Sequence, residues 1–110
     1  MSDDIFYIKQ NDTSPDFAAV LTDAAGSLAA LTGATVQFHM AEEDGTVVVD
    51  AAATVVSTVT ATVSYAWQVG DTATPGKYYA EFEVTFSNGK VETFPNDRKG
   101  ARILIQPELN

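Results

Sequence analysis

The feature that most constrains the fold is an alternating segment over residues 76–95. From Tyr78 to Phe86, apolar and polar side chains alternate, which places one set on each face of an extended strand. Asn88-Gly89 then tolerates the positive φ angles of a two-residue type I′ turn. The chain returns through a second extended stretch and stops at Pro95, which has no N–H for a sheet. The segment predicts a long antiparallel β-hairpin with one apolar and one polar face.

The remaining extended segments are short and are separated by turn-forming residues at intervals of roughly eight to twelve residues. They are Ile5–Gln10, Phe17–Leu21, Thr35–Glu43, Val47–Val49, Ala53–Val56, Ala61–Trp67 and Ala101–Gln106. A turn near Ser57–Thr60 separates two of them, and Ser27–Leu31 is either one helical turn or an extended connector. This pattern predicts an all-β protein, an antiparallel immunoglobulin-like β-sandwich of about seven to eight strands.

Length and composition predict one domain over residues 1–110, and they also bear on the compartment in which the chain folds. The chain has no cysteine, which excludes a disulfide framework and fits folding in a reducing cytosol. No stretch approaches the roughly 20 apolar residues that span a bilayer, so no membrane partner is expected. The acidic start lacks the basic and apolar regions of a secretory signal.

Negative charge is concentrated in the first half of the chain. Nine acids against one base give −8 over residues 1–50, whereas six acids against five bases give −1 over residues 51–110. An acidic surface repels phosphate, so nucleic-acid binding is disfavoured. Two interpretations of the acids stay open: they keep a β-rich protein in solution, or they meet a basic neighbour in an assembly.

Three groups of polar residues are candidates for metal binding or catalysis. His39 is the only histidine, and with no cysteine it does not complete a zinc set, so it is either a structural cross-strand residue or an interface residue. The run 42–44 holds three acids in a turn, without the spacing of an EF-hand. Glu81 and Glu83 share one strand face about 7 Å apart, a separation that suits paired glycosidase carboxylates, but nothing apolar beside them would raise a pKa. We therefore expect no catalytic, cofactor-binding or metal-binding residues and no cofactor.

Several aromatic residues are close in sequence and have two interpretations. Tyr65, Trp67 and Tyr78 lie on faces that suit core packing, although aromatics also form sugar-binding platforms. Tyr79 points to the polar face of its hairpin, so it is the clearest candidate for contact with a partner.

The order of turns and aromatic strands resembles the N-terminal immunoglobulin-like domain of phage baseplate upper proteins and related small virion modules of tailed phages. Leu31-Thr32-Gly33-Ala34 leads into an aromatic strand, Tyr65-Ala66-Trp67 forms another, and Gly76-Lys77-Tyr78 opens the long hairpin. The similarity covers nearly the whole chain, but the baseplate proteins continue into further segments. The resemblance brings no catalytic residues with it.

The resemblance implies a non-enzymatic structural component of a tailed-phage virion, in the baseplate, tail, neck or capsid surface. Such a protein would be made in the host bacterial cytoplasm, reside in the virion, and bind other virion structural proteins and copies of itself. The residues expected to bind partners are Phe6, Tyr7, Phe17 and Tyr79. The alternative is a carbohydrate or cell-surface binding module that would use Tyr65, Trp67 and Tyr79.

Overall fold

The computed structural model describes residues 5–96 and 99–109, which form eight β-strands. The strands are β1 (Ile5–Lys9), β2 (Phe17–Val20), β3 (Thr35–Glu42), β4 (Val47–Ser57), β5 (Thr62–Tyr65), β6 (Gly76–Thr85), β7 (Val91–Phe94) and β8 (Ala101–Gln106). Within these ranges the chain forms no helix, and so none that could cross a membrane.

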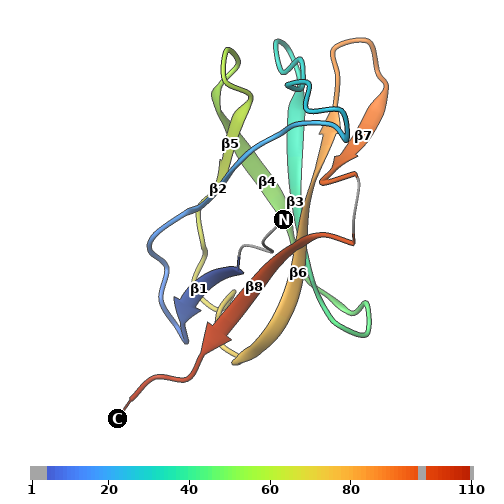
Figure 1. Cartoon of the computed structure of the whole chain (residues 1–110). Helices are drawn as coiled ribbons and strands as arrows, with labels where there is room; N and C mark the ends of the chain where they lie inside the picture. Colours follow the sequence, from blue (N-terminus) through green and yellow to red (C-terminus); the bar gives the residue numbers. More distant parts are fainter. Residues whose placement is uncertain (1–4, 97–98, 110) are drawn as a thin grey trace.

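The strands form two sheets that share β4 (Figure 1). The first has the order β1-β8-β6-β3-β4, with β7 pairing beside the second half of β6; the second has the order β4-β5-β2. All pairs are antiparallel except β1 and β8, which are parallel. The predicted all-β, immunoglobulin-like sandwich is confirmed, and the parallel pair is a departure from the purely antiparallel arrangement that we expected.

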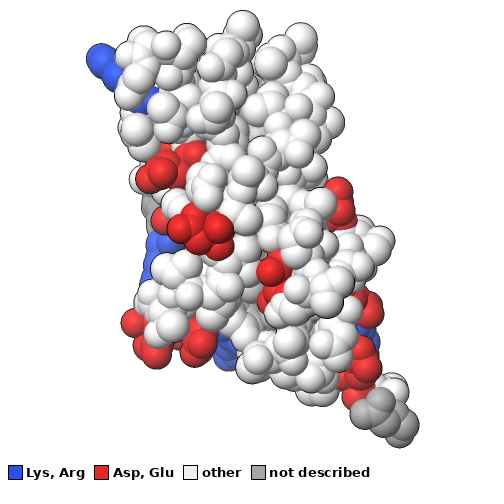
Figure 2. Space-filling view, turned by 180° about the vertical axis from the view of Figure 1, so that it is seen from behind, with Lys and Arg blue, Asp and Glu red and all other residues white. Residues whose placement is uncertain are grey.

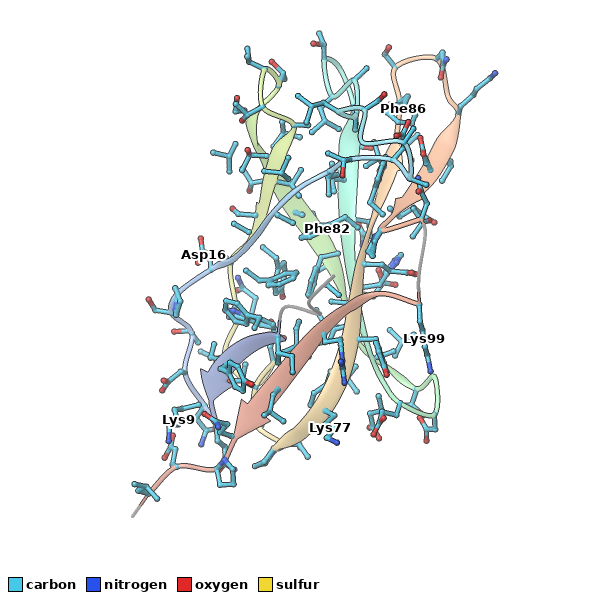
Figure 3. All side chains as sticks on the ribbon, in the orientation of Figure 1. Lys9, Asp16, Lys77, Phe82, Phe86 and Lys99 are labelled. Carbon is cyan, nitrogen blue, oxygen red and sulfur yellow. The ribbon has the colours of Figure 1, made fainter. Side chains whose placement is uncertain are left out.

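The core between the sheets is built largely from stacked aromatic rings. Phe17 of β2 stacks on Phe82 of β6, with ring centres 5.8 Å apart, and Tyr65 of β5 stacks on Phe38 of β3 at 4.3 Å. Phe82 points into the space between the sheets, as its place in the alternating segment requires (Figure 3). Ring pairs of this kind join the two sheets across their apolar faces.

The long hairpin is confirmed as β6 and β7, but the turn is not the predicted type I′. Its loop has three residues, 87–89, because the Phe86 N–H donates to the Lys90 carbonyl at 2.8 Å and the Gly89 N–H donates to the Phe86 carbonyl at 2.8 Å. A type I′ turn needs two positive φ angles, whereas Gly89 has a φ of 87° and Asn88 is not in that region. The Asn88 side chain instead accepts the Lys90 N–H at 3.0 Å, which closes the turn from inside.

The same three-residue loop joins β3 to β4. The Glu42 N–H donates to the Thr46 carbonyl at 2.9 Å, Gly45 has a φ of 95°, and Asp44 accepts the Thr46 N–H at 2.9 Å. An Asx side chain followed by glycine therefore sets both hairpin turns.

Three further expectations concern the turn after β4, β4 itself and the connector before β3. The predicted turn at Ser57–Thr60 is confirmed in substance, since β4 ends at Ser57 and β5 begins at Thr62. The separate strands predicted at 47–49 and 53–56 are wrong, because β4 runs unbroken through both and changes partner from β3 to β5. Residues 27–31 form an extended connector with an isolated bridge between Thr22 and Leu28.

Candidate functional site

Strand register brings three polar side chains into one row on the outer face of the first sheet. His39 of β3 lies opposite Glu81 of β6 on one side and Asp50 of β4 on the other. Its Nε2 is 3.1 Å from Asp50 Oδ1, and its Nδ1 is 3.9 Å from Glu81 Oε1. Gln37 donates to the same Asp50 oxygen at 2.8 Å. Cross-strand pairing thus fixes the imidazole between two carboxylates.

The next row of the same face is hollow, because its central residue is small. Ala41 of β3 lies between Tyr79 of β6 and Val47 of β4, so a methyl group forms the floor and larger side chains form the walls. The hollow holds about 310 Å³ and is also lined by the row of His39 and its two carboxylates and by Glu42. We call this surface the outer hollow.

Lys99, which precedes β8, closes one side of the outer hollow. Its ammonium lies 4.7 Å from the centre of the Tyr79 ring and donates to the Glu43 carbonyl at 3.2 Å. Figure 3 shows the Lys99 side chain reaching toward the turn between β3 and β4. A cation over an aromatic face is attracted by the ring quadrupole, so the pair holds the Tyr79 ring in place.

The residues predicted to bind partners do not lie together. Tyr79 is at the outer hollow, and Tyr7 is exposed on β1. Phe17 is 6% exposed and belongs to the core, so its side chain does not meet a partner and that part of the prediction is wrong. Phe6 is partly buried and packs on Phe17 at 5.1 Å between ring centres.

The aromatic platform of the carbohydrate alternative does not exist on the surface. Tyr65 is 2% and Trp67 is 4% exposed, and both rings pack against Phe38. The Tyr65 hydroxyl donates to Asp71 at 2.5 Å, and burial together with this carboxylate raises the pKa of Tyr65. The core interpretation of these residues is therefore correct, and Tyr79 alone stays outside.

The acidic turn 42–44 has a structural explanation. Asp44 caps the turn by accepting the Thr46 N–H, and this hydrogen bond lowers the pKa of Asp44. Within residues 5–96 and 99–109, no group of three or more His, Cys, Asp or Glu side chains is arranged to hold a metal ion. Glu81 and Glu83 lie on the outer face, beside polar cross-strand neighbours.

No protein-family model and no curated protein matches the chain. A solved structure, CopC from Methylosinus trichosporium OB3b, is similar at 15% sequence identity and a TM-score of 0.45, over 87% of this chain and 98% of that chain. A similarity this low carries no conclusion about what this chain binds.

Three of our expectations are corrected here and are not proposed again: the role as a tailed-phage virion component, the assignment to phage tail and baseplate proteins, and residence in a virion. The similar solved structure reported above is CopC. The resemblance to the baseplate domain itself is untested by these comparisons and stays a prediction.

Sequence reasoning missed Asp50 and Lys99 as parts of the site. Counting back along both strands from a turn at Glu43–Gly45 places Val49 opposite His39, and it is a β-bulge between Met40 and Ala41 that shifts the register and brings Asp50 there. Lys99 was also out of reach, because it approaches Tyr79 from 20 positions away in sequence through a connection between strands.

Proposed function

We propose that this chain is a non-catalytic protein-interaction module that binds a partner polypeptide at the outer hollow. The observation that carries the proposal is the hollow itself: an aromatic wall, an alanine floor and carboxylates, all on the outer face of a rigid sheet. Aromatic residues are enriched at protein interfaces because they bring large contact area and a polar tip.

The side chains that line the outer hollow indicate which kind of partner residue fits it. Asp50, Glu81 and Glu42 bring carboxylates to the hollow, whereas Lys99 is the single Lys or Arg among those lining residues that the structure describes. Ala41 and Val47 supply an apolar strip between them. An arginine side chain fits this arrangement, because its aliphatic stem covers apolar surface while its guanidinium hydrogen-bonds a carboxylate through two N–H groups.

Support for a non-catalytic role comes from the same residues. His39 Nε2 lies 3.1 Å from Asp50 Oδ1, and among the described residues the lining of the hollow includes no Ser, Thr or Cys that the imidazole would activate. The interior is filled by the aromatic core, which directs a partner to the outer surface.

The test is a titration with blocked arginine (N-acetyl-arginine amide), followed by amide chemical shifts, with blocked glutamate as the matched probe. We expect saturable shifts at His39, Tyr79 and Glu81 with the arginine probe at millimolar concentration. Glu81→Gln should weaken binding about two- to fivefold, the usual range for one exposed ion pair. Glu92→Gln, on the edge strand β7, is the control variant and should leave the affinity unchanged.

Equal shifts with blocked glutamate, or shifts spread over the whole surface, would overturn the proposal. So would equal weakening by Glu81→Gln and Glu92→Gln, because general attraction to an acidic protein would then account for the binding.

A further inference from the structure

A second hollow lies on the outer face of the first sheet, in line with the outer hollow along β3. It holds about 530 Å³, and its lining comes from the first half of β3, the second half of β4 and the end of β6. Strand register places Gln37 of β3 between Ala52 of β4 and Glu83 of β6. Because Gln37 donates to Asp50, its side chain is directed toward the outer hollow, and the space above the Ala52 methyl group stays open. We call this surface the second hollow.

Glu83 brings a carboxylate without a cation to the second hollow. Its side chain is half-buried on the outer face, and within residues 5–96 and 99–109 it pairs with no lysine, arginine or histidine. Its neighbours across the strands, Gln37 and Thr93, are uncharged. Since hydrogen bonds between a carboxylate and a cation are stronger than those between neutral groups, a basic side chain of a partner is the group that Glu83 binds best.

The two hollows present their carboxylates at the repeat of an extended chain. Glu81 lines the outer hollow and Glu83 lines the second hollow, two residues apart on one face of β6. The rise along a strand is about 3.4 Å per residue, so the two positions are about 7 Å apart. Side chains two residues apart in an extended peptide share a face and have the same repeat. A peptide laid along β6 therefore brings residues i and i+2 to these carboxylates and turns residue i+1 away.

Uncharged residues complete the second hollow. Thr35 and Thr85 lie opposite each other at its far end, and their hydroxyl groups can donate to and accept from a peptide backbone. In Figure 2 the upper end of the molecule, which includes the turn between β6 and β7, is white apart from basic atoms at one corner, and acidic side chains gather below it. Along the outer face of β6 the acidic side chains are Glu81 and Glu83, between Tyr79 and Thr85, so this line offers two carboxylates.

We propose that the partner of the outer hollow is an extended polypeptide segment with two basic residues separated by one residue. One basic side chain binds beside Glu81 in the outer hollow, and the other binds beside Glu83 in the second hollow. This inference rests on the proposed arginine site and specifies the sequence that the site recognises.

Charge complementarity favours such a segment. Among the lining residues that the structure describes, the carboxylates of the two hollows outnumber the single ammonium group of Lys99; they are those of Glu42, Asp50, Glu81 and Glu83. The chain as a whole carries −9, which attracts a basic segment and repels an acidic one.

The experiment titrates the whole chain with short blocked alanine peptides that carry two arginines at different spacings, followed by amide chemical shifts. Arginines separated by one alanine should bind about two- to fivefold more tightly than adjacent arginines or arginines separated by two alanines, because the second ion pair forms only at the matching spacing. All three peptides carry the same charge, so charge alone does not produce this preference. With the matching peptide, the shifts at Glu81 and Glu83 should saturate together.

Two variants locate the second basic residue. Glu83→Gln removes the carboxylate of the second hollow and should abolish the preference for the matching peptide, while blocked arginine binds this variant as it binds the wild type. Glu92→Gln is the matched control. Glu92 pairs with Val84, whose side chain is buried in the core, so Glu92 lies on the other face of the sheet and its loss should leave the preference unchanged.

Equal affinity for the three peptides, or a preference that Glu83→Gln retains, would overturn this inference and leave the arginine site standing as long as blocked arginine still binds. If blocked arginine itself does not bind, the proposed function is overturned, and this inference with it.

Discussion

Phe38 is the residue whose removal should cost the fold most. Its side chain is fully buried, and its ring contacts those of Phe17, Tyr65, Trp67 and Phe82 at centre distances of 5.8, 4.3, 5.8 and 5.3 Å. Replacing a buried Phe by Ala costs about 3–5 kcal/mol, and each aromatic pair adds about 0.5–1.5 kcal/mol beyond buried area. Because Phe38 makes four such pairs, we expect Phe38→Ala to lower the free energy of unfolding by about 4–5 kcal/mol, the upper end of this range.

The assay is urea unfolding followed both by circular dichroism and by the fluorescence of Trp67, whose buried ring reports on the same cluster. Because a small domain is stable by only about 5–15 kcal/mol, Phe38→Ala risks unfolding the chain, so Phe38→Leu is measured beside it. Leu keeps most of the volume but loses the ring contacts, which predicts a loss of about 1–2 kcal/mol.

Val59→Ala is the control, because Val59 is 83% exposed in the turn between β4 and β5, and it should change stability by less than about 0.5 kcal/mol. A loss below about 1 kcal/mol for Phe38→Ala, with the urea dependence unchanged, would refute the reasoning that this ring is the centre of a tightly packed core.

Two further predictions concern the backbone and pH. Gly100→Ala should destabilise the chain by about 2–3 kcal/mol, because a Cβ there would lie 2.9 Å from the Ala80 carbonyl oxygen. Gly26→Ala places a Cβ in open space at a φ of 88° and should cost about 1 kcal/mol through backbone strain alone, and equal losses in thermal unfolding would contradict the steric argument. Burial and the Asp71 carboxylate raise the folded-state pKa of Tyr65 above the unfolded value of about 10, so the stability that depends on its protonated form is present below pH 10 and falls as pH rises further. Tyr65→Phe should flatten this alkaline loss in urea titrations at several pH values, and an unchanged slope would disprove the role of its hydroxyl.

Local features of the fold were predictable because they depend on neighbours in sequence. The faces of β6 follow from strict alternation between Tyr78 and Val84, and every second side chain there is buried. The position of the hairpin turn followed from Asn88-Gly89, although its type did not. Side-chain capping by Asn88 favours a three-residue loop over the two-residue loop that the dipeptide alone suggests.

The interaction surfaces were predicted less well, because exposure depends on which strands meet. Phe17 and Tyr79 are both aromatic residues within strands, yet Phe17 is covered by Phe82 from the opposite sheet, while Tyr79 lies outside.

The sequence by itself therefore determined an all-β chain, the two faces of β6 and the places where the chain turns, since these reflect side-chain periodicity and local hydrogen bonding. The tertiary structure alone decided the parallel pairing of β1 with β8, the row of Glu81, His39 and Asp50, and the position of β2 at the end of the second sheet. The physical reason is that these features arise from contacts between segments distant in sequence, whose pairing is selected by burial of the common core.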